Sequence, residues 1–520
     1  MSTSASKDAA MKFGKKLSAV VCKAVPSDLR YVLLFVGCAS LAGCALGPDF
    51  HRPEPPTGES VLNNKDRPAA SLDADRHAQH FDKQADLPAK WWARFSSEKI
   101  DTLVTQALER SPSLKSAQAT LRQSQDNLRA GYGVFFPQIG ASVQATREVS
   151  TINLPAPLGQ GLTAVGPYNL GTLGVNVNYV LDIFGGERRT VEALGAVVDV
   201  QHYAMLAAYL SLTSNVVNTA IARAGYQAQR DATLALIRMQ DEQIHIAQVQ
   251  YDSGTATYSA VLTLKSQQAS NAAAVAALEQ RVDQSDHLLA QLCGQSPAEF
   301  SAPTISLEAI ALPAELPDSL PSTLARHRPD ILAAEGSLHQ ASAQIGIATA
   351  DLFPTLTLGG TAGYAHNVLA HILRSGTQFW SAQASLAGSI FSGGSQWFAR
   401  KAAIDAYDAS LGQYEQTVLT ALEQVADTMR ALEHDAQALR AQVDALQAAS
   451  ENEKLTQANY EAGTAGYLDM LTADAQYQQA RLGYLGAVAQ RLQDTVALYA
   501  ALGGGWWQQD APIAASGALH

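Results

Sequence analysis

One twelve-residue pattern occurs twice in this chain, 209 residues apart, and it constrains the fold more than any other feature. Residues 251–262 read YDSGTATYSAVL, and residues 460–471 read YEAGTAGYLDML. In both copies a glycine in a polar turn separates a long helical stretch from a shorter one. Self-similarity over so large a spacing is typical of a duplicated half-protein, so the sequence predicts two similar halves.

Two shorter motifs upstream repeat in the same way. Phe136-Pro137 returns as Phe353-Pro354, 217 residues later. Ile183-Phe184-Gly-Gly returns as Ile390-Phe391-Ser-Gly-Gly, 207 to 208 residues later. The first half therefore carries about nine extra residues between these two motifs.

The N-terminus has the layout of a signal peptide. Residues 1–30 hold six basic and two acidic residues, and an apolar run of ten residues follows at 31–40. That run is too short for a membrane-spanning helix, which needs about 20 residues, and Leu41-Ala-Gly-Cys44 comes directly after it. We expect cleavage before Cys44 and bacterial lipidation of its thiol, with an ordinary cleavage site as the alternative. Either Met1 or Met11 could be the true start.

Charge and cysteine usage exclude two classes of protein. The whole chain has a net charge of −12, and loss of residues 1–43 leaves about −16 without any basic stripe; this argues against a nucleic-acid partner. Cys22 and Cys38 leave with the signal peptide and Cys44 is lipidated, so Cys293 remains alone and no intramolecular disulfide is possible. Cys293 lies at an apolar helix end, which favours a packed thiol over a reactive one.

Four segments alternate apolar and polar or small residues with a period of two: 139–145, 173–179, 356–364 and 380–390. Their length and their uncharged faces indicate strands that cross a membrane, whereas the edge sheet of a soluble sandwich is the alternative. Four strands cannot close a barrel, and lipid tolerates no open sheet edge. The chain must therefore pool its strands with identical copies, two copies giving eight strands and three giving twelve.

Long segments without proline predict unusually long helices. Residues 186–252 and 394–461 form stretches of 67 and 68 residues, each roughly 100 Å long as a helix. Shorter helices are predicted at 259–293 and 468–502, after the repeated turns, and at 113–136 and 330–353, before the strands. A shorter pair stacked end to end nearly equals one long helix, and abundant alanine permits close packing. The sequence therefore predicts a helical barrel or a coiled-coil tube.

Proline-rich stretches divide the chain. We expect a lipoprotein signal peptide (1–43), a lipid anchor with an N-terminal linker (44–90), a first repeat (91–293), a linker (294–328), a second repeat (329–507) and a flexible tail (508–520).

Several further motifs together identify a family. They are Leu41–Cys44 followed by Gly47-Pro48-Asp49-Phe50, Trp91-Trp92, Arg328-Pro329-Asp330-Ile331 with Glu335, Gln344–Pro354, and the ending Leu498–Trp506. With these motifs the chain resembles the TolC-like outer-membrane factors over residues 31–507, in their lipidated, NodT-type branch.

The resemblance implies a mixed α/β membrane protein with the trimeric TolC-like fold. A 12-stranded β-barrel, with four strands from each chain, would continue into a long periplasmic α-helical barrel. The homotrimer would sit in the bacterial outer membrane as the passive exit duct of a tripartite efflux pump for drugs or other toxic small molecules. Its partners would be a periplasmic adaptor (membrane fusion) protein and an inner-membrane pump, usually of the resistance-nodulation-division type. Type I protein secretion and a lipid-anchored helical scaffold without a pore are the alternatives.

The resemblance also implies roles for the two repeated turns, as periplasmic tips. Asp469 and Asp474 become candidates for an acidic gate, and Tyr460 matches a tyrosine that some relatives latch to an arginine, although Ala465 occupies that arginine position here. Asp469 could equally be an acid favoured by the helix dipole. Ala260 stands where the second copy has Asp469, so only one repeat would line the constriction. The candidate adaptor contacts, which could instead cap and pack the turns, are Gly254, Thr255, Val261, Leu262, Gly463, Thr464, Met470 and Leu471.

No other chemistry is indicated. Gly359, Gly360 and Gly363 lie in a predicted strand with no lysine after them, so they form no phosphate loop. His77 and His80 have no further ligand nearby in the sequence, and methionine is scarce, which gives no support for copper export. We expect no metal, no cofactor and no enzymatic activity.

Overall fold

A computed structural model describes residues 45–54, 56, 61–62, 71–74, 77–82, 85, 87–153, 162–317 and 321–508. The chain divides into two compact units. Unit 1 comprises Met1–Phe50, Asp126–Ala196 and His339–Ala409, and unit 2 comprises His51–Gln125, Val197–Leu338 and Ser410–His520. The predicted signal peptide (1–43), the predicted lipidation site Cys44 and the predicted tail after Gln508 lie outside the described residues.

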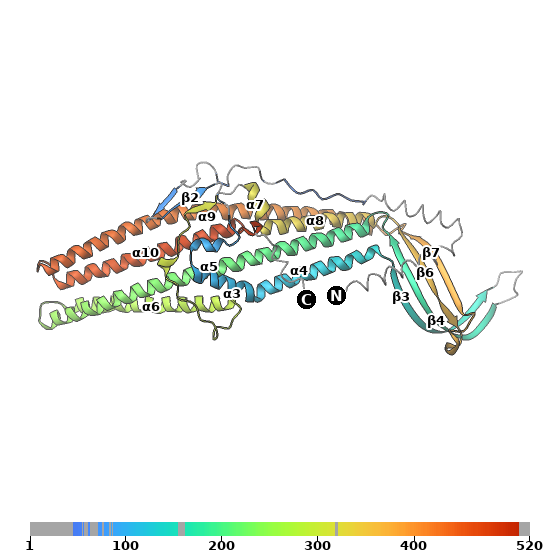
Figure 1. The fold of residues 1–520 in the computed structure, drawn as a ribbon, viewed down its shortest axis with the longest axis horizontal. Helices are drawn as coiled ribbons and strands as arrows, with labels where there is room; N and C mark the ends of the chain where they lie inside the picture. Colours follow the sequence, from blue (N-terminus) through green and yellow to red (C-terminus); the bar gives the residue numbers. More distant parts are fainter. Residues whose placement is uncertain are drawn as a thin grey trace, which may run out of the picture. The chain divides into compact units, whose positions relative to one another are not determined.

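The four alternating segments are strands, as predicted, and they form one antiparallel sheet in unit 1 (Figure 1). Its strands are β3 (Gln138–Asn153), β4 (Leu162–Leu181), β6 (Thr355–His366) and β7 (Gln378–Ala387), in the order β3-β4-β6-β7. β3 and β4 span 16 and 20 residues and extend well beyond the alternating segments 139–145 and 173–179. The main-chain hydrogen bonds between β3 and β4 continue beyond the alternating segments into more polar sequence. Strand ends cannot be predicted there, because apolar and polar residues no longer alternate.

Six helices follow the predicted layout of the two halves. They are α4 (Pro112–Gly131), α5 (Gly186–Asp252), α6 (Tyr258–Leu292), α8 (Pro329–Ala350), α9 (Ser395–Glu461) and α10 (Tyr467–Ala501). The boundary between the units falls within α4, α5, α8 and α9. In the described part of the chain, α5 alone is long and apolar enough to span a membrane, but 56% of its apolar window is buried within the chain, as in a core helix.

α4 and α8 end earlier than predicted. The α-helical part of α4 stops at Gly131, and a short 3-10 turn, η3 (Tyr132–Phe135), leads toward Pro137. α8 likewise stops at Ala350, ahead of Pro354. A residue that precedes proline is pushed toward extended backbone, so neither helix can reach the Phe-Pro step.

The core of unit 2 contains an aromatic cluster. Trp91 and Phe95, in the 3-10 helix η2 (Trp91–Phe95), pack against Tyr499 of α10, with the Trp91 and Tyr499 ring centroids 5.8 Å apart. All three side chains are fully buried. Beside this cluster lies α3 (Glu98–Arg110), which the sequence analysis did not predict.

The two segments predicted as linkers contain secondary structure. β1 (Ser71–Ala74) and β2 (His77–Asp82) come from residues 44–90, whereas β5 (Glu315–Pro317) and α7 (Pro321–His327) come from residues 294–328. The three strands form a second sheet in the order β1-β2-β5.

Buried Gln79 attaches this second sheet to α10. Its amide donates to the Pro313 carbonyl at 3.0 Å, and its side-chain oxygen accepts from Nε of Arg491 at 2.9 Å. Pairing between segments more than 200 residues apart is not visible in local sequence patterns.

Cys293 is fully buried, as predicted for a packed thiol. Its Sγ lies 3.8 Å from the Leu103 carbonyl oxygen. Burial raises the pKa of this thiol to about 11, so the reactive thiolate is scarce at neutral pH.

Candidate channel and docking sites

The two repeated turns adopt the same backbone conformation. Gly254 joins α5 to α6 with φ +77°, and Gly463 joins α9 to α10 with φ +74°. Each glycine N–H donates to the carbonyl of the tyrosine three residues earlier, Tyr251 or Tyr460, at 2.9 Å. Because side chains disfavour positive φ, glycine is required at both turns.

The threonine after each glycine closes the turn. The N–H of Thr255 donates to the carbonyl of Gln250 at 2.9 Å, and its hydroxyl donates to the same oxygen at 2.9 Å. Thr464 makes the same two bonds to Asn459, at 2.8 and 3.0 Å. The Gly-Thr pair thus satisfies helix C-terminal carbonyls that have no partner within the helix.

A pair of tyrosine rings spans each turn. Tyr251 and Tyr258 have ring centroids 5.1 Å apart, and Tyr460 and Tyr467 have centroids 5.4 Å apart. Tyr460 therefore contacts Tyr467 of its own chain, whereas Ala465 offers no cation. Tyr258 and Tyr467 escaped the sequence analysis, although both belong to the repeated pattern.

Asp469 caps α10. Its Oδ2 accepts the backbone N–H of Gly466, the N-cap residue, at 2.9 Å, which is one half of a capping box. Glycine has no side chain to supply the other half. Ala260, at the equivalent position of α6, has no side chain for this bond. The structural role of Asp469 is thus visible within one chain, and its side chain remains exposed; the gate role stays a prediction.

Asp474 pairs with a second acid. Burial raises the pKa of Asp474, and a hydrogen bond with Glu453 of α9 partly offsets that shift. Burial and the Asp474 carboxyl raise the pKa of Glu453 as well, with Lys454 acting against them. In the first hairpin the equivalent positions hold Ile244 and Lys265. The second hairpin therefore carries a hydrogen-bonded pair of acids at positions where the first has isoleucine and lysine.

The predicted docking residues divide by exposure. Val261 and Leu471 are buried, at 0% and 4%, and they support the turns from inside. Met470 is half-buried. The exposed members are Gly254, Thr255, Leu262, Gly463 and Thr464.

The sheet of unit 1 has two unpaired edges within the described chain, β3 and β7. Apolar side chains near these edges are largely exposed in the single chain, with Val143 of β3 at 75% and Trp380 of β7 at 80%. β7 is exposed along its whole length. Unpaired main-chain groups on an edge strand favour pairing with another strand.

A strap of residues 45–50, which directly follows Cys44, is attached to the start of α5. The N–H of Leu46 donates to the carbonyl of Phe184 at 3.0 Å. Arg189, only 4% exposed, donates to the Leu46 carbonyl at 3.2 Å and to the carboxylates of Asp49 and Glu192, each at 2.7 Å. The described chain next to the predicted lipid attachment point is therefore fixed at the β4–α5 junction. No local sequence pattern points to Arg189, because its partners Leu46 and Asp49 lie far from it in the sequence.

No group of three or more His, Cys, Asp or Glu side chains arranged to hold a metal occurs among the described residues. Gly359, Gly360 and Gly363 lie within β6, so they line no phosphate site.

The chain combines an antiparallel sheet, whose strands alternate apolar and polar or small residues, with helical hairpins that each join a 67-residue helix to a 35-residue helix. This combination is the architecture of outer-membrane channel proteins. The chain belongs to the outer membrane efflux protein family, whose family model matches residues 103–295 and 320–504.

Curated relatives resemble nearly the whole chain. The toluene efflux pump outer membrane protein TtgC of Pseudomonas putida is 28% identical over 478 residues, covering 90% of this chain and 94% of the relative. Nodulation protein T of Rhizobium leguminosarum bv. viciae is 27% identical over 470 residues, covering 90% and 92%. These matches confirm the identification of the TolC-like family and its NodT-type branch.

Solved structures share the fold. The outer-membrane channel OprN aligns with a TM-score of 0.76 and 26% identity, over 89% of this chain and 100% of that one. The open state of the Neisseria gonorrhoeae MtrE outer membrane channel aligns with a TM-score of 0.75, over 90% of this chain and 100% of that one. At 24% identity, the second match supports the fold alone.

Proposed function

We propose that this protein is the outer-membrane channel of a tripartite efflux pump, a passive homotrimeric exit duct for small molecules. One observation carries the proposal: a four-stranded membrane-type sheet with two unpaired edges, in a chain of the outer membrane efflux protein family. Lipid permits no unpaired strand edge, so the sheet must close with strands of further copies. Three copies supply twelve strands, which together form one barrel.

The long helices extend the duct into the periplasm. α5, α6, α9 and α10 from three chains line the tunnel, and its far end is formed by the repeated turns. A periplasmic adaptor docks there through the exposed Gly-Thr steps and Leu262, with Met470 at the margin. An inner-membrane pump of the resistance-nodulation-division type supplies the energy. Acyl chains on Cys44 anchor the complex in outer-membrane lipid.

The carboxylates of the second hairpin form the gate. Three copies of exposed Asp469 around the axis concentrate negative charge, which favours cations over anions in the opening. Asp474 and Glu453 add further acidic groups in the same hairpin. Tyr460 and Tyr467 stabilise the turn that carries them.

The exported compounds are small and organic. Relatives include a toluene efflux pump protein, an antibiotic efflux pump protein and a pyoverdine export protein, all with sequence identities from 25% to 28%. None of these names describes a protein substrate, which favours efflux over type I secretion.

Single-channel conductance in planar bilayers tests the proposal, with wild-type protein compared with Asp469→Asn. We expect a small cation-selective current whose selectivity falls in the variant, because the ring of charge is lost. Asparagine keeps an oxygen that can accept the Gly466 N–H, so the cap is preserved. An oligomer that conducts in neither form, even after adaptor is added, would support the scaffold alternative.

Export in cells complements this measurement. A strain that lacks the chain should regain resistance to organic solvents or antibiotics when wild-type protein is restored. Restored secretion of a protein without restored resistance would instead favour type I secretion.

A further inference from the structure

We propose that the sheet of unit 1 binds the phosphate group of a glycolipid in the outer leaflet of the membrane, through Arg147, Asn169 and His366. This proposal rests on the barrel proposed above and adds to it a lipid-binding site that export itself does not require.

One face of the sheet is apolar along most of its length. The last apolar row of this face runs from Val143 through Leu173 to Tyr364, which lie opposite one another in the register. Val143 and Trp380, both on this face, are largely exposed, at 75% and 80%. Tyrosine and tryptophan near the end of such a face are typical of a membrane interface. In the proposed barrel this face therefore contacts the acyl chains of the lipid.

Polar side chains end the apolar face. His366 lies two residues beyond Tyr364 and opposite Gly171, and Arg147 lies opposite Asn169. β3 begins directly after η3 and β4 ends shortly before α5, so these polar residues lie at the end of the strands away from the helices. No acidic residue occupies the described positions of this face, so its polar end carries the positive charge of Arg147.

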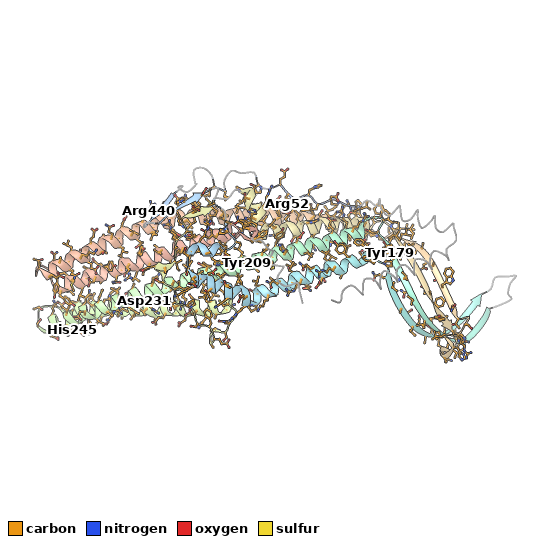
Figure 2. The ribbon with its side chains drawn as sticks, viewed as in Figure 1. Arg52, Tyr179, Tyr209, Asp231, His245 and Arg440 are labelled. Atoms are coloured by element: carbon orange, nitrogen blue, oxygen red, sulfur yellow. The ribbon has the colours of Figure 1, made fainter. Side chains whose placement is uncertain are left out.

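The length of β4 places this polar end at the level of the lipid headgroups. Asn169 is ten residues from Tyr179, which lies at the helix end of the same face and is labelled in Figure 2. Ten residues extend roughly 34 Å along a strand, and a tilt of about 35–45° reduces this to roughly 24–28 Å across the membrane. The apolar band of outer-membrane barrels is about 25 Å tall. With the helices in the periplasm, Arg147 and Asn169 reach the headgroups of the outer leaflet.

A cavity of about 400 Å³ lies at this end of the sheet. Arg147, Asn169 and Gly171 line it from β3 and β4, and Asn367 and Val368 line it from the β6–β7 loop. Arg147 and Asn169 are exposed, so both side chains are accessible to a ligand.

The β6–β7 loop fixes the ring of His366. Its Nδ1 accepts the backbone N–H of Val368 at 2.9 Å, and its ring contacts that of His371, with centroids 5.7 Å apart. With Nδ1 as an acceptor, the proton of the neutral imidazole lies on Nε2, which is then a donor for an anion.

A phosphate attached to acyl chains fits this arrangement. A guanidinium binds phosphate through paired, charge-assisted hydrogen bonds, and the amide of Asn169 and the imidazole of His366 add neutral donors. The apolar face continues from these groups, so acyl chains of the same molecule pack along Val143 and Leu173. A free phosphate ion would gain nothing from that face. In the outer leaflet of an outer membrane the phosphate-bearing lipid is a glycolipid, which is therefore the occupant.

Native mass spectrometry of the full-length oligomer, titrated with lipid A, tests the site. We expect one tightly bound lipid A for each chain, since each copy carries the three residues. Arg147→Gln should weaken binding about tenfold, because charge-assisted hydrogen bonds are lost. Arg147→Lys, which keeps the charge, should retain most of the binding.

A charge-relocation variant is the matched control. Thr146→Arg combined with Arg147→Gln keeps the net charge of the chain but moves the guanidinium to the other face of β3, because successive side chains alternate between faces. This variant should bind lipid A as weakly as Arg147→Gln alone. Wild-type affinity in the relocated variant would overturn the site, since charge on either face would then suffice. Unchanged affinity in Arg147→Gln would overturn it as well.

Two further ligands identify the part of the lipid that is bound. Lipid A without its phosphates should bind about tenfold more weakly, and millimolar inorganic phosphate should not displace lipid A. Equal binding of the dephosphorylated lipid, or displacement by inorganic phosphate, would overturn the proposed occupant. A monomer in the same spectra would contradict the proposed homotrimer instead, whereas an intact trimer that conducts but binds no lipid A would overturn the lipid site alone.

Discussion

The two hairpin tips share a backbone and differ in charge. At both, a glycine with positive φ and a threonine bonded to the preceding helix make the same turn. At three equivalent positions, however, the first hairpin has Ile244, Ala260 and Lys265, whereas the second has Glu453, Asp469 and Asp474. Duplication has kept the turn, and at these three positions only the second copy has acidic side chains.

The shared turn and the differing charges suggest two separate functions for the hairpin tips. A turn that must satisfy helix-end carbonyls allows few residue types, so its chemistry is the same in both copies. The charges lie on helices that tolerate either sign, so they can serve a role that one hairpin performs. We interpret the shared turn as the docking element and the acidic second hairpin as the gate.

Replacement of the turn glycines should have the largest effect. Gly463→Phe and Gly254→Phe each force a side chain into positive φ, at a cost of about 1–2 kcal/mol, and each places a ring on the docking surface. We expect either variant to lose drug resistance in an export assay, while native mass spectrometry still shows the trimer.

Gly376→Phe is the matched control for these variants. Gly376 has φ +92° and open space around it, but it lies in the β6–β7 loop. That variant should retain export. Normal export by Gly463→Phe would remove the docking role of the tips, and export by Gly254→Phe alone would confine docking to the second hairpin.

Exchange of the cap residues should have a smaller effect. Asp469→Ala removes the side chain that accepts the Gly466 N–H and should cost about 1 kcal/mol of stability. Ala260→Asp should build the same cap on α6, with the Thr257 N–H as donor, and raise stability. Thermal unfolding measures both. Equal melting temperatures for Asp469→Ala and Asp469→Asn would mean that the cap contributes nothing and that Asp469 serves the gate alone.

Loss of the contact between the two tyrosine rings should lower the melting temperature by the same amount at either tip. Tyr258→Leu and Tyr467→Leu each remove one ring from a contact of nearly equal geometry, 5.1 and 5.4 Å between centroids. We expect equal and small drops in melting temperature, because edge and face attractions between rings are weak. A clearly larger drop at Tyr467 would show that the acidic hairpin depends on its ring pair for more than packing.

The sequence predicted the elements that depend on local pattern. The bounds of α5 agree at both ends, since no proline interrupts residues 186–252 and glycine-containing turns flank them. The positions of the four strands of the first sheet, and both turn glycines, followed from alternation and from the repeat.

Contacts between distant segments escaped prediction. Glu453 lies 21 residues from Asp474 in the sequence, and only the pairing of α9 with α10 brings the two carboxyls together. Gln79 and Arg491 are separated by 412 residues. Their partners are set by tertiary packing, which no periodicity encodes. α3 is a different case, since Ile100, Leu103, Val104 and Ala107 show helical spacing that was overlooked.

The smallest expected effect concerns the acid pair and pH. Folding raises the pKa of both Glu453 and Asp474, so the folded hairpin binds more protons than the unfolded chain. Stability from this pair is therefore complete below the unfolded pKa values, near about 4, and declines as pH rises through the raised folded values. Asp474→Asn removes one of the two carboxyls and should make the fall in melting temperature shallower over that range. Lys265→Gln, at the equivalent position of the first hairpin, should leave the profile unchanged. If Asp474→Asn instead steepened the fall, the pair would be stabilised by its charge, and the contrast between Glu453 and Asp474 of the second hairpin and Ile244 and Lys265 of the first would need a different physical basis.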